Sequence, residues 1–208
     1  MDWVIGIDFD NTLVSYDDII CSIAVQQGLI APGTGKSKKD VRDRIRQLPQ
    51  GDIEWQKLQT IVYGTRMAEA SLIDGVSEFF DSCKRYHIRI YVISHKTEYV
   101  KLGEASINLR TAALAWMKKN KFFVPEGLGL SYQDVYFEWT RGEKIERIKT
   151  LKCTHFIDDL EELFLENSFP GDVEKILYAP HMRELPLPGI RLISSWREMG
   201  EHFFDAGK

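Results

Sequence analysis

Six short apolar runs recur along this 208-residue chain, and segments with helical spacing of apolar residues separate several of them. The runs cover residues 4–7, 88–93, 135–137, 154–157, 176–178 and 190–193. A short apolar run that stops at polar residues is typical of a strand buried on both faces of a parallel sheet. Helical spacing is clearest at 76–83, 109–117 and 145–151. Strands that alternate with helices predict an α/β fold with a doubly wound, mainly parallel, Rossmann-like sheet.

One stretch breaks this alternation. Between Tyr16 and Leu72 the pattern predicts only helices, at 17–27, 38–47 and 52–63, with glycine and proline residues between them. We therefore expect a small helical insertion at 16–72, directly after the first strand. Residues 1–15 and 73–208 then form the core domain.

Composition narrows the class of protein. Hydrophobic residues make up 44% of the chain and charged residues 28%, which is ordinary for a globular protein and excludes a mainly disordered one. The net charge of −4 argues against a general nucleic-acid binder. The segment 36–46 departs from this average, because its six basic and two acidic residues give it a local charge of +4.

Signals for secretion and for membranes are missing from the sequence. No apolar run approaches the roughly 20 residues that span a bilayer, and the N-terminus has no basic region or cleavage site of a signal peptide. The three cysteines, Cys21, Cys83 and Cys153, are odd in number and lack metal-type spacing. We expect a cytoplasmic protein with free, buried thiols and no membrane partner.

Polar side chains gather where three of the predicted strands end. They are Asp8 and Asp10 after the first strand, Ser94 after the second, and Asp158 and Asp159 after the strand at 154–157. Lys144 lies at the start of the helix that precedes this last strand. Ligands of open α/β sheets bind at the carboxyl ends of the strands, so we expect these groups to converge. Clustered carboxylates repel one another unless a cation holds them, and Mg²⁺ prefers oxygen ligands.

These residues resemble the four motifs of the haloacid dehalogenase-like (HAD) superfamily, in the family's order. The string Asp8-Phe9-Asp10-Asn11-Thr12-Leu13 resembles motif I (DxDxT), Ser94 motif II, Lys144 motif III, and Phe156-Ile157-Asp158-Asp159 the DD form of motif IV. The resemblance covers almost the whole chain. The insertion at 16–72 matches only in its position, which is that of the small α-helical C1-type cap.

The resemblance implies a Mg²⁺-dependent phosphohydrolase that acts on a small phosphorylated metabolite through an aspartyl-phosphate intermediate. Asp8 would be the nucleophile, and Asp10 would protonate the leaving oxygen and then take a proton from water. Ser94 and Lys144, with Asn11, would bind the phosphate. An aspartate at the Asp10 position is similar to phosphatases and phosphomutases, whereas the dehalogenases typically lack it.

The expected metal ligands are Asp8, the backbone carbonyl of Asp10, and Asp158. Asp159 is either a second carboxylate of the metal site or an acceptor behind it. Arg141 is an alternative to Lys144 as the phosphate-binding cation. Asn11 is also explained by a turn, and Ser94 by a helix cap.

The insertion carries further candidates. Lys36, Arg42 and Arg66 are expected to contact a second anionic group of the substrate, although a solvated helix face also explains the basic segment. Residues 31–37 resemble the end of a Walker A loop, but Ile30 stands where that pattern needs glycine and a helix precedes it. We therefore expect no ATP site there.

Several functional questions stay open at the level of sequence. A phosphomutase would keep every motif residue, and a non-catalytic binding or regulatory protein is an alternative of another class. His95 beside Ser94 is either a phosphate or proton contact or a structural histidine. The identity of the substrate is open, and so is the choice between a monomer and a homodimer.

Overall fold

The computed structural model describes residues 2–35, 37–99, 107–182 and 187–205, and the chain folds as two compact units. Unit 1 consists of Met1–Val14, Leu72–Lys96 and Asn120–Lys208. Unit 2 consists of Ser15–Ser71 and Thr97–Lys119. The described helices include none that is long and apolar enough to cross a membrane.

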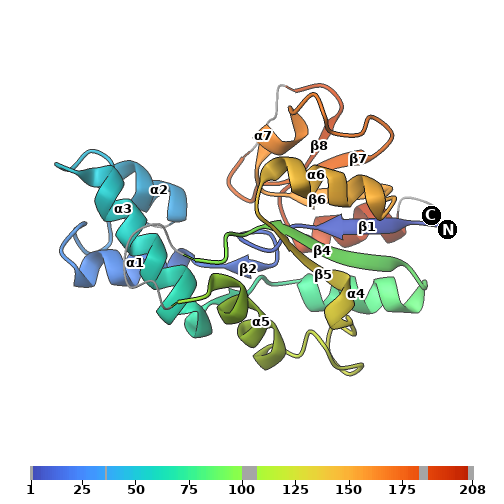
Figure 1. Cartoon of the computed structure of the whole chain (residues 1–208), viewed down its shortest axis with the longest axis horizontal. Helices are drawn as coiled ribbons and strands as arrows, with labels where there is room; N and C mark the ends of the chain where they lie inside the picture. The colour runs from blue at the N-terminus through green and yellow to red at the C-terminus, as the bar shows by residue number, and fades with distance from the viewer. Residues whose placement is uncertain (1, 36, 100–106, 183–186, 206–208) are drawn as a thin grey trace. The chain divides into compact units, whose positions relative to one another are not determined.

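Unit 1 is built on a six-stranded parallel sheet with the strand order β5-β4-β1-β6-β7-β8 (Figure 1). The strands are β1 (Val4–Ile7), β4 (Arg89–His95), β5 (Val135–Glu138), β6 (His155–Asp158), β7 (Glu174–Tyr178) and β8 (Ile190–Ile193). Each of them coincides with one of the six predicted apolar runs. The α/β Rossmann-like fold class is thereby confirmed.

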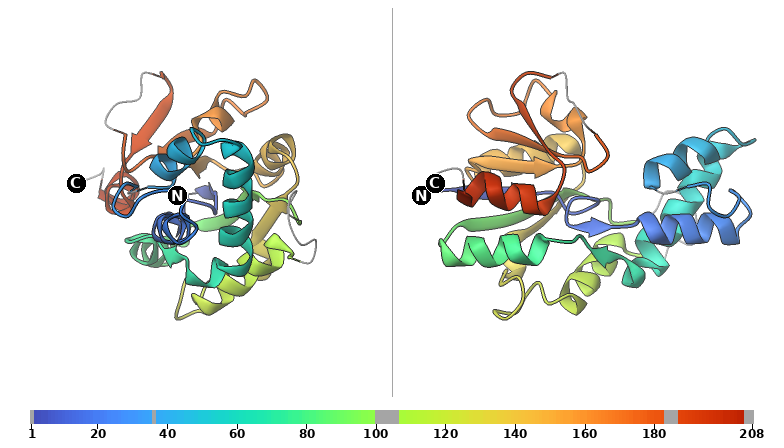
Figure 2. Two further views of the ribbon diagram at one scale, coloured as in Figure 1. Left: turned by 90° about the vertical axis from the view of Figure 1, so that its left-hand side faces the viewer. Right: turned by 180° about the vertical axis from the view of Figure 1, so that it is seen from behind.

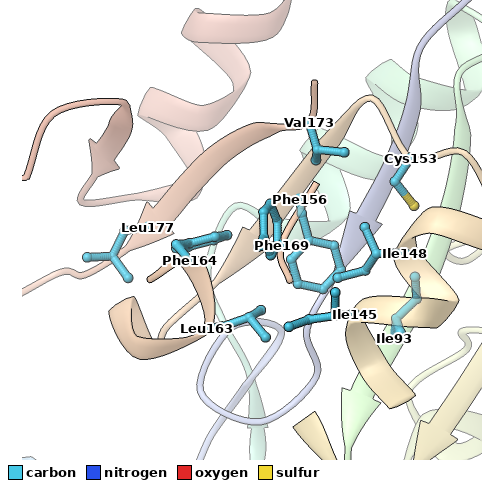
Figure 3. Packing of buried hydrophobic residues seen from close by; sticks show 10 residues of the cluster. All are labelled: Ile93, Ile145, Ile148, Cys153, Phe156, Leu163, Phe164, Phe169, Val173 and Leu177. Carbon is cyan, nitrogen blue, oxygen red and sulfur yellow. The ribbon is translucent and has the colours of Figure 1, made fainter. Parts of the chain in front are cut away.

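Helices cover both faces of this sheet (Figure 2). They are α4 (Val76–Arg85), α6 (Arg141–Thr150), α7 (Glu161–Phe164) and α8 (Trp196–Gly200), with the short turns η3 (Tyr132–Asp134) and η4 (Glu201–Asp205). On one face, Ile145 and Ile148 of α6 pack with Phe156 of β6 in a fully buried cluster (Figure 3). On the other face, the ring centroid of Phe79 in α4 lies 5.0 Å from that of Trp196 in α8.

Unit 2 is helical. Its first segment holds α1 (Asp17–Gln26), α2 (Lys38–Ile45), α3 (Gly51–Thr60), η1 (Ile61–Thr65) and η2 (Met67–Glu69), and its second segment holds α5 (Leu109–Lys119). The helices of the first segment correspond to those predicted for the insertion.

Helix α5 departs from the predicted organisation, because the sequence pattern assigned it to the core domain at 73–208. Trp116 of α5 is only 2% exposed, and its indole Nε1 donates a hydrogen bond to the carbonyl oxygen of Ala70 at 2.8 Å. Lys119 Nζ donates to the carbonyl oxygen of Ala68 at 3.1 Å. A helix between two neighbouring parallel strands normally covers their sheet, but the apolar face of α5 packs on η1 and η2 instead.

Two short strands, β2 (Val14–Ser15) and β3 (Ser71–Leu72), pair where the chain enters and leaves the insertion. No strand was predicted in this region. Two residues are too few to show an alternating pattern, so only the pairing itself reveals these strands.

Candidate active site

The loop after β1 places the first two acidic side chains. Asp8 is 5% exposed, and its backbone N–H donates to the carbonyl oxygen of Ile157 at 2.9 Å, which continues the β1–β6 ladder. The chain then turns at Asn11, whose φ of 60° is left-handed, and Asn11 N–H donates to Val14 O at 2.8 Å. Asparagine tolerates this conformation better than most residues. The turn leaves the Asp10 side chain partly exposed, at 21%.

Lys144 lies between two buried carboxylates. Its Nζ donates to Asp8 Oδ1 at 2.6 Å and to Asp158 Oδ2 at 2.6 Å. The second oxygen of Asp158, Oδ1, accepts the backbone N–H of Leu160 at 2.9 Å. Three side chains, from the loop after β1, from β6 and from α6, thus meet at the carboxyl edge of the sheet.

The charges of this group depend on one another. Burial opposes the ammonium form of Lys144, but the neighbouring charges of Asp158 and Asp8 outweigh burial and raise its pKa above the ordinary range. Burial also raises the pKa of Asp158, and the charge of Lys144 offsets part of that shift. Lys144 therefore stays protonated at neutral pH.

The N-terminus of α6 positions Lys144. Thr140 Oγ1 accepts the N–H of Glu143 at 3.1 Å, and Glu143 Oε2 accepts the N–H of Thr140 at 3.2 Å, which forms a capping box. Arg141, the alternative cation, is exposed and its Nη1 lies 2.8 Å from Glu166 Oε1. The structure thus brings Lys144 rather than Arg141 to Asp8.

Lys96 is a member of the site that the sequence analysis missed. Its side chain is 4% exposed, and its Nζ donates to the two carboxylate oxygens of Asp10 at 2.7 and 3.0 Å. Lys96 is two residues beyond Ser94, and alternate residues of an extended chain point to the same side. The spacing of two residues from Ser94 is the sequence signal that points to Lys96.

Carboxylate oxygens of Asp8, Asp158 and Asp159 all lie within 4.8 Å of one another, which suits a metal ion. The sequence analysis expected the backbone carbonyl of Asp10, and not its carboxylate, to bind the metal. Among the described residues, the Asp10 carboxylate is not part of this group. Asn11 Nδ2, expected at the phosphate, donates to Asp159 Oδ2 at 3.2 Å. Ser94 is in β4 with 1% of its surface exposed, and His95 at the end of that strand is exposed.

Of the residues expected to contact substrate from the insertion, Arg42 and Arg66 belong to unit 2. Lys36 lies outside the described residues. Arg42 Nε lies 2.9 Å from Asp43 Oδ1. Arg66 pairs with Glu69 through Nε and Nη2, the latter at 2.6 Å.

The structure also tests the prediction for the three cysteines. All three are free; Cys83 and Cys153 are buried, and Cys21 is partly exposed. This confirms the prediction of free thiols and corrects the prediction of burial for Cys21.

Comparison with known proteins finds similar folds among solved structures. No protein-family model matches the chain, and neither does any curated protein. Among solved structures, a haloacid dehalogenase-like family hydrolase from Streptococcus pneumoniae has a TM-score of 0.61 at 13% identity, over 97% of this chain and 98% of that one. A HAD family hydrolase from Deinococcus radiodurans, with bound phosphate and sodium, has a TM-score of 0.58 at 15% identity, over 99% and 96%. A structure described as a dehalogenase has a TM-score of 0.55 at 10% identity, over 97% and 96%.

These similarities, together with the parallel sheet, define the fold of the chain. The chain has the haloacid dehalogenase-like fold.

Proposed function

We propose that the protein is a Mg²⁺-dependent phosphohydrolase that cleaves the monoester of a small phosphorylated metabolite. The observation that supports this most directly is the buried ammonium of Lys144, 2.6 Å from both Asp8 and Asp158. A nucleophilic carboxylate needs nearby positive charge before it can approach a phosphate dianion.

The residues present fit a divalent cation. Asp8, Asp158 and Asp159 offer three hard oxygen donors within 4.8 Å of one another, and Mg²⁺ prefers such ligands. A bound Mg²⁺ would neutralise charge on the phosphate and align it for displacement.

The side chains of the site supply the remaining chemistry. An oxygen of Asp8 forms a bond to phosphorus while the bond from phosphorus to the leaving oxygen breaks. Asp10, which must be protonated for this step, gives its proton to that oxygen and becomes a carboxylate. Asp10 then takes a proton from water, whose oxygen attacks phosphorus and releases Asp8. Lys144 and Ser94 hold the non-bridging oxygens as charge develops on them.

The test is hydrolysis of p-nitrophenyl phosphate with and without Mg²⁺. Asp8→Asn should lower the rate by about 10³-fold or more, because the nucleophile is lost. Asp172→Asn, at an exposed position of unit 1, should leave it unchanged. If folded wild-type protein releases no phosphate with any divalent metal, the proposed function is wrong.

The same samples distinguish related activities. The fold similarity to a described dehalogenase makes halide release from a 2-haloacid the necessary comparison. We expect none, because the second aspartate, Asp10, suits protonation of a leaving oxygen. Release of inorganic phosphate without an isomerised product separates hydrolysis from phosphomutase activity.

A further inference from the structure

A pocket with a volume of about 320 Å³ lies between α2 and α3, formed entirely by residues of unit 2. Its lining residues are Lys38, Arg42, Arg46, Asp52, Trp55, Gln56 and Gln59. The volume is at the small end of the range for ligand-binding pockets. None of the residues proposed for hydrolysis in unit 1 belongs to it.

Helix α2 contributes the positive side of the pocket. Lys38, Arg42 and Arg46 follow one another at intervals of four residues, so they share one face of the helix and its C-terminal end. Val41 and Ile45 form the buried face of the same helix. The sequence therefore separates an apolar packing face from a face of three cations.

Helix α3 contributes the other side. Trp55 is 4% exposed and gives the pocket an aromatic, apolar wall. Gln56 and Gln59 add amide groups that both donate and accept hydrogen bonds. Asp52 is the single carboxylate of the lining, and its Oδ1 lies 2.9 Å from Arg46 Nε.

The three cations of this face repel one another within the helix. Like charges four residues apart destabilise a helix. The carboxylates that approach the two arginines, Asp43 and Asp52, do so at Nε, whereas a guanidinium carries five N–H donors. Lys38 Nζ lies 5.6 Å from the ring centroid of Tyr63. An anion with several oxygens would accept charge-assisted hydrogen bonds from the guanidinium groups of Arg42 and Arg46.

We propose that the α2–α3 pocket binds a small organic anion that carries two or more phosphate or carboxylate groups. The three cations recognise the anionic groups, and Trp55 with the two amides contacts the organic part. The pocket's volume favours a compact ligand. This proposal does not depend on the proposed hydrolysis.

Calorimetric titration of the full-length protein tests it, in metal-free buffer, with inorganic pyrophosphate and with citrate as probes. Binding of at least one probe with a Kd below about 1 mM supports a small-anion site. The two probes separate phosphate from carboxylate recognition. Arg42→Gln should weaken that binding about tenfold or more, since hydrogen bonds to charged groups are lost.

Two control variants locate the binding. Arg197→Gln removes an arginine of unit 1 whose side chain is 89% exposed and paired with Glu201, and it should leave the Kd unchanged. Asp8→Asn should also leave the Kd unchanged, because Asp8 is not part of the pocket. The proposal is overturned if neither probe binds at millimolar concentration, if Arg42→Gln binds as wild type does, or if Arg197→Gln weakens binding equally. The two proposals can fail separately. Hydrolysis without anion binding would contradict only the pocket, and anion binding without hydrolysis would contradict only the proposed phosphohydrolase.

Discussion

Lys144 is the residue of the site whose charge we expect to matter most for the stability of the fold. Its ammonium is buried with two carboxylates, so its charge compensates theirs where water does not reach. Replacing a whole buried ion pair by apolar residues often changes stability little. Removing only one partner is strongly destabilising, because it leaves the other charge buried and uncompensated.

Lys144→Met should therefore lower the free energy of unfolding by about 3–5 kcal/mol, measured by urea denaturation. Lys149→Met on the same helix is the matched control, because Lys149 pairs with Glu146 at the surface. That variant should change stability by less than about 1 kcal/mol. Equal effects of the two variants would contradict the proposed energetics of the site.

The three cysteines differ in burial, and we expect them to differ in their reactivity with a thiol reagent. Burial raises the pKa of Cys83 and of Cys153 to about 12. At pH 8 both are therefore protonated, and only the thiolate reacts with iodoacetamide. Mass spectrometry of the folded protein should find Cys21 labelled first and the two buried thiols labelled only after unfolding in urea. Labelling of Cys83 in the folded protein at the rate of Cys21 would contradict this.

At the scale of elements, β1 depends on a glycine in the middle of the sheet. A Cβ at Gly6 would lie 2.5 Å from Cδ2 of Phe156, a fully buried ring of the neighbouring strand β6. The ring is part of the buried cluster that includes Ile145 and Ile148 of α6, so a shift of the ring would disturb its neighbours (Figure 3).

Gly6→Ala should lower the free energy of unfolding by about 1–3 kcal/mol through this overpacking. Gly200→Ala in α8 is the control, since its Cβ would meet no atom within 4 Å. That change should be neutral or stabilise by less than about 1 kcal/mol. Thermal or urea unfolding of both variants provides the comparison, and a neutral Gly6→Ala would refute the steric argument.

At the scale of the whole molecule, unit 2 combines two segments that are separated in the sequence. Its second segment contains α5, whose buried residues include Leu109, Ala113, Trp116 and Met117. These side chains are covered within a unit whose other members come from Ser15–Ser71.

Replacing residues 16–70 alone by a short linker should therefore expose the apolar face of α5 and give a less cooperative, aggregation-prone protein. Removing 97–119 in addition should restore a cooperative unfolding transition. Thermal unfolding of both deletions, followed by circular dichroism, provides the measurement. Equal stability of the two deletions would contradict the assignment of α5 to unit 2.

Local patterns predicted much of this architecture and of the candidate site. The apolar runs identified the six strands of the unit 1 sheet, because a strand buried on both faces leaves a continuous apolar run that does not depend on its partners. The same runs placed Asp8, Ser94 and Asp158 at strand ends. The pairing of β2 with β3 and the packing of α5 left no such signature, since each depends on segments distant in the sequence.

The sequence by itself determined that the chain forms a parallel α/β sheet with a helical insertion and that acidic and basic groups gather at one edge of it. Hydrophobic periodicity and strand ends carry that information locally. Only the tertiary structure decided which groups meet: Lys144 rather than Arg141 reaches Asp8, and Lys96 binds Asp10. The register of neighbouring strands and the orientation of a helix determine which side chains meet. The residues adjacent to a side chain in the sequence determine neither of these.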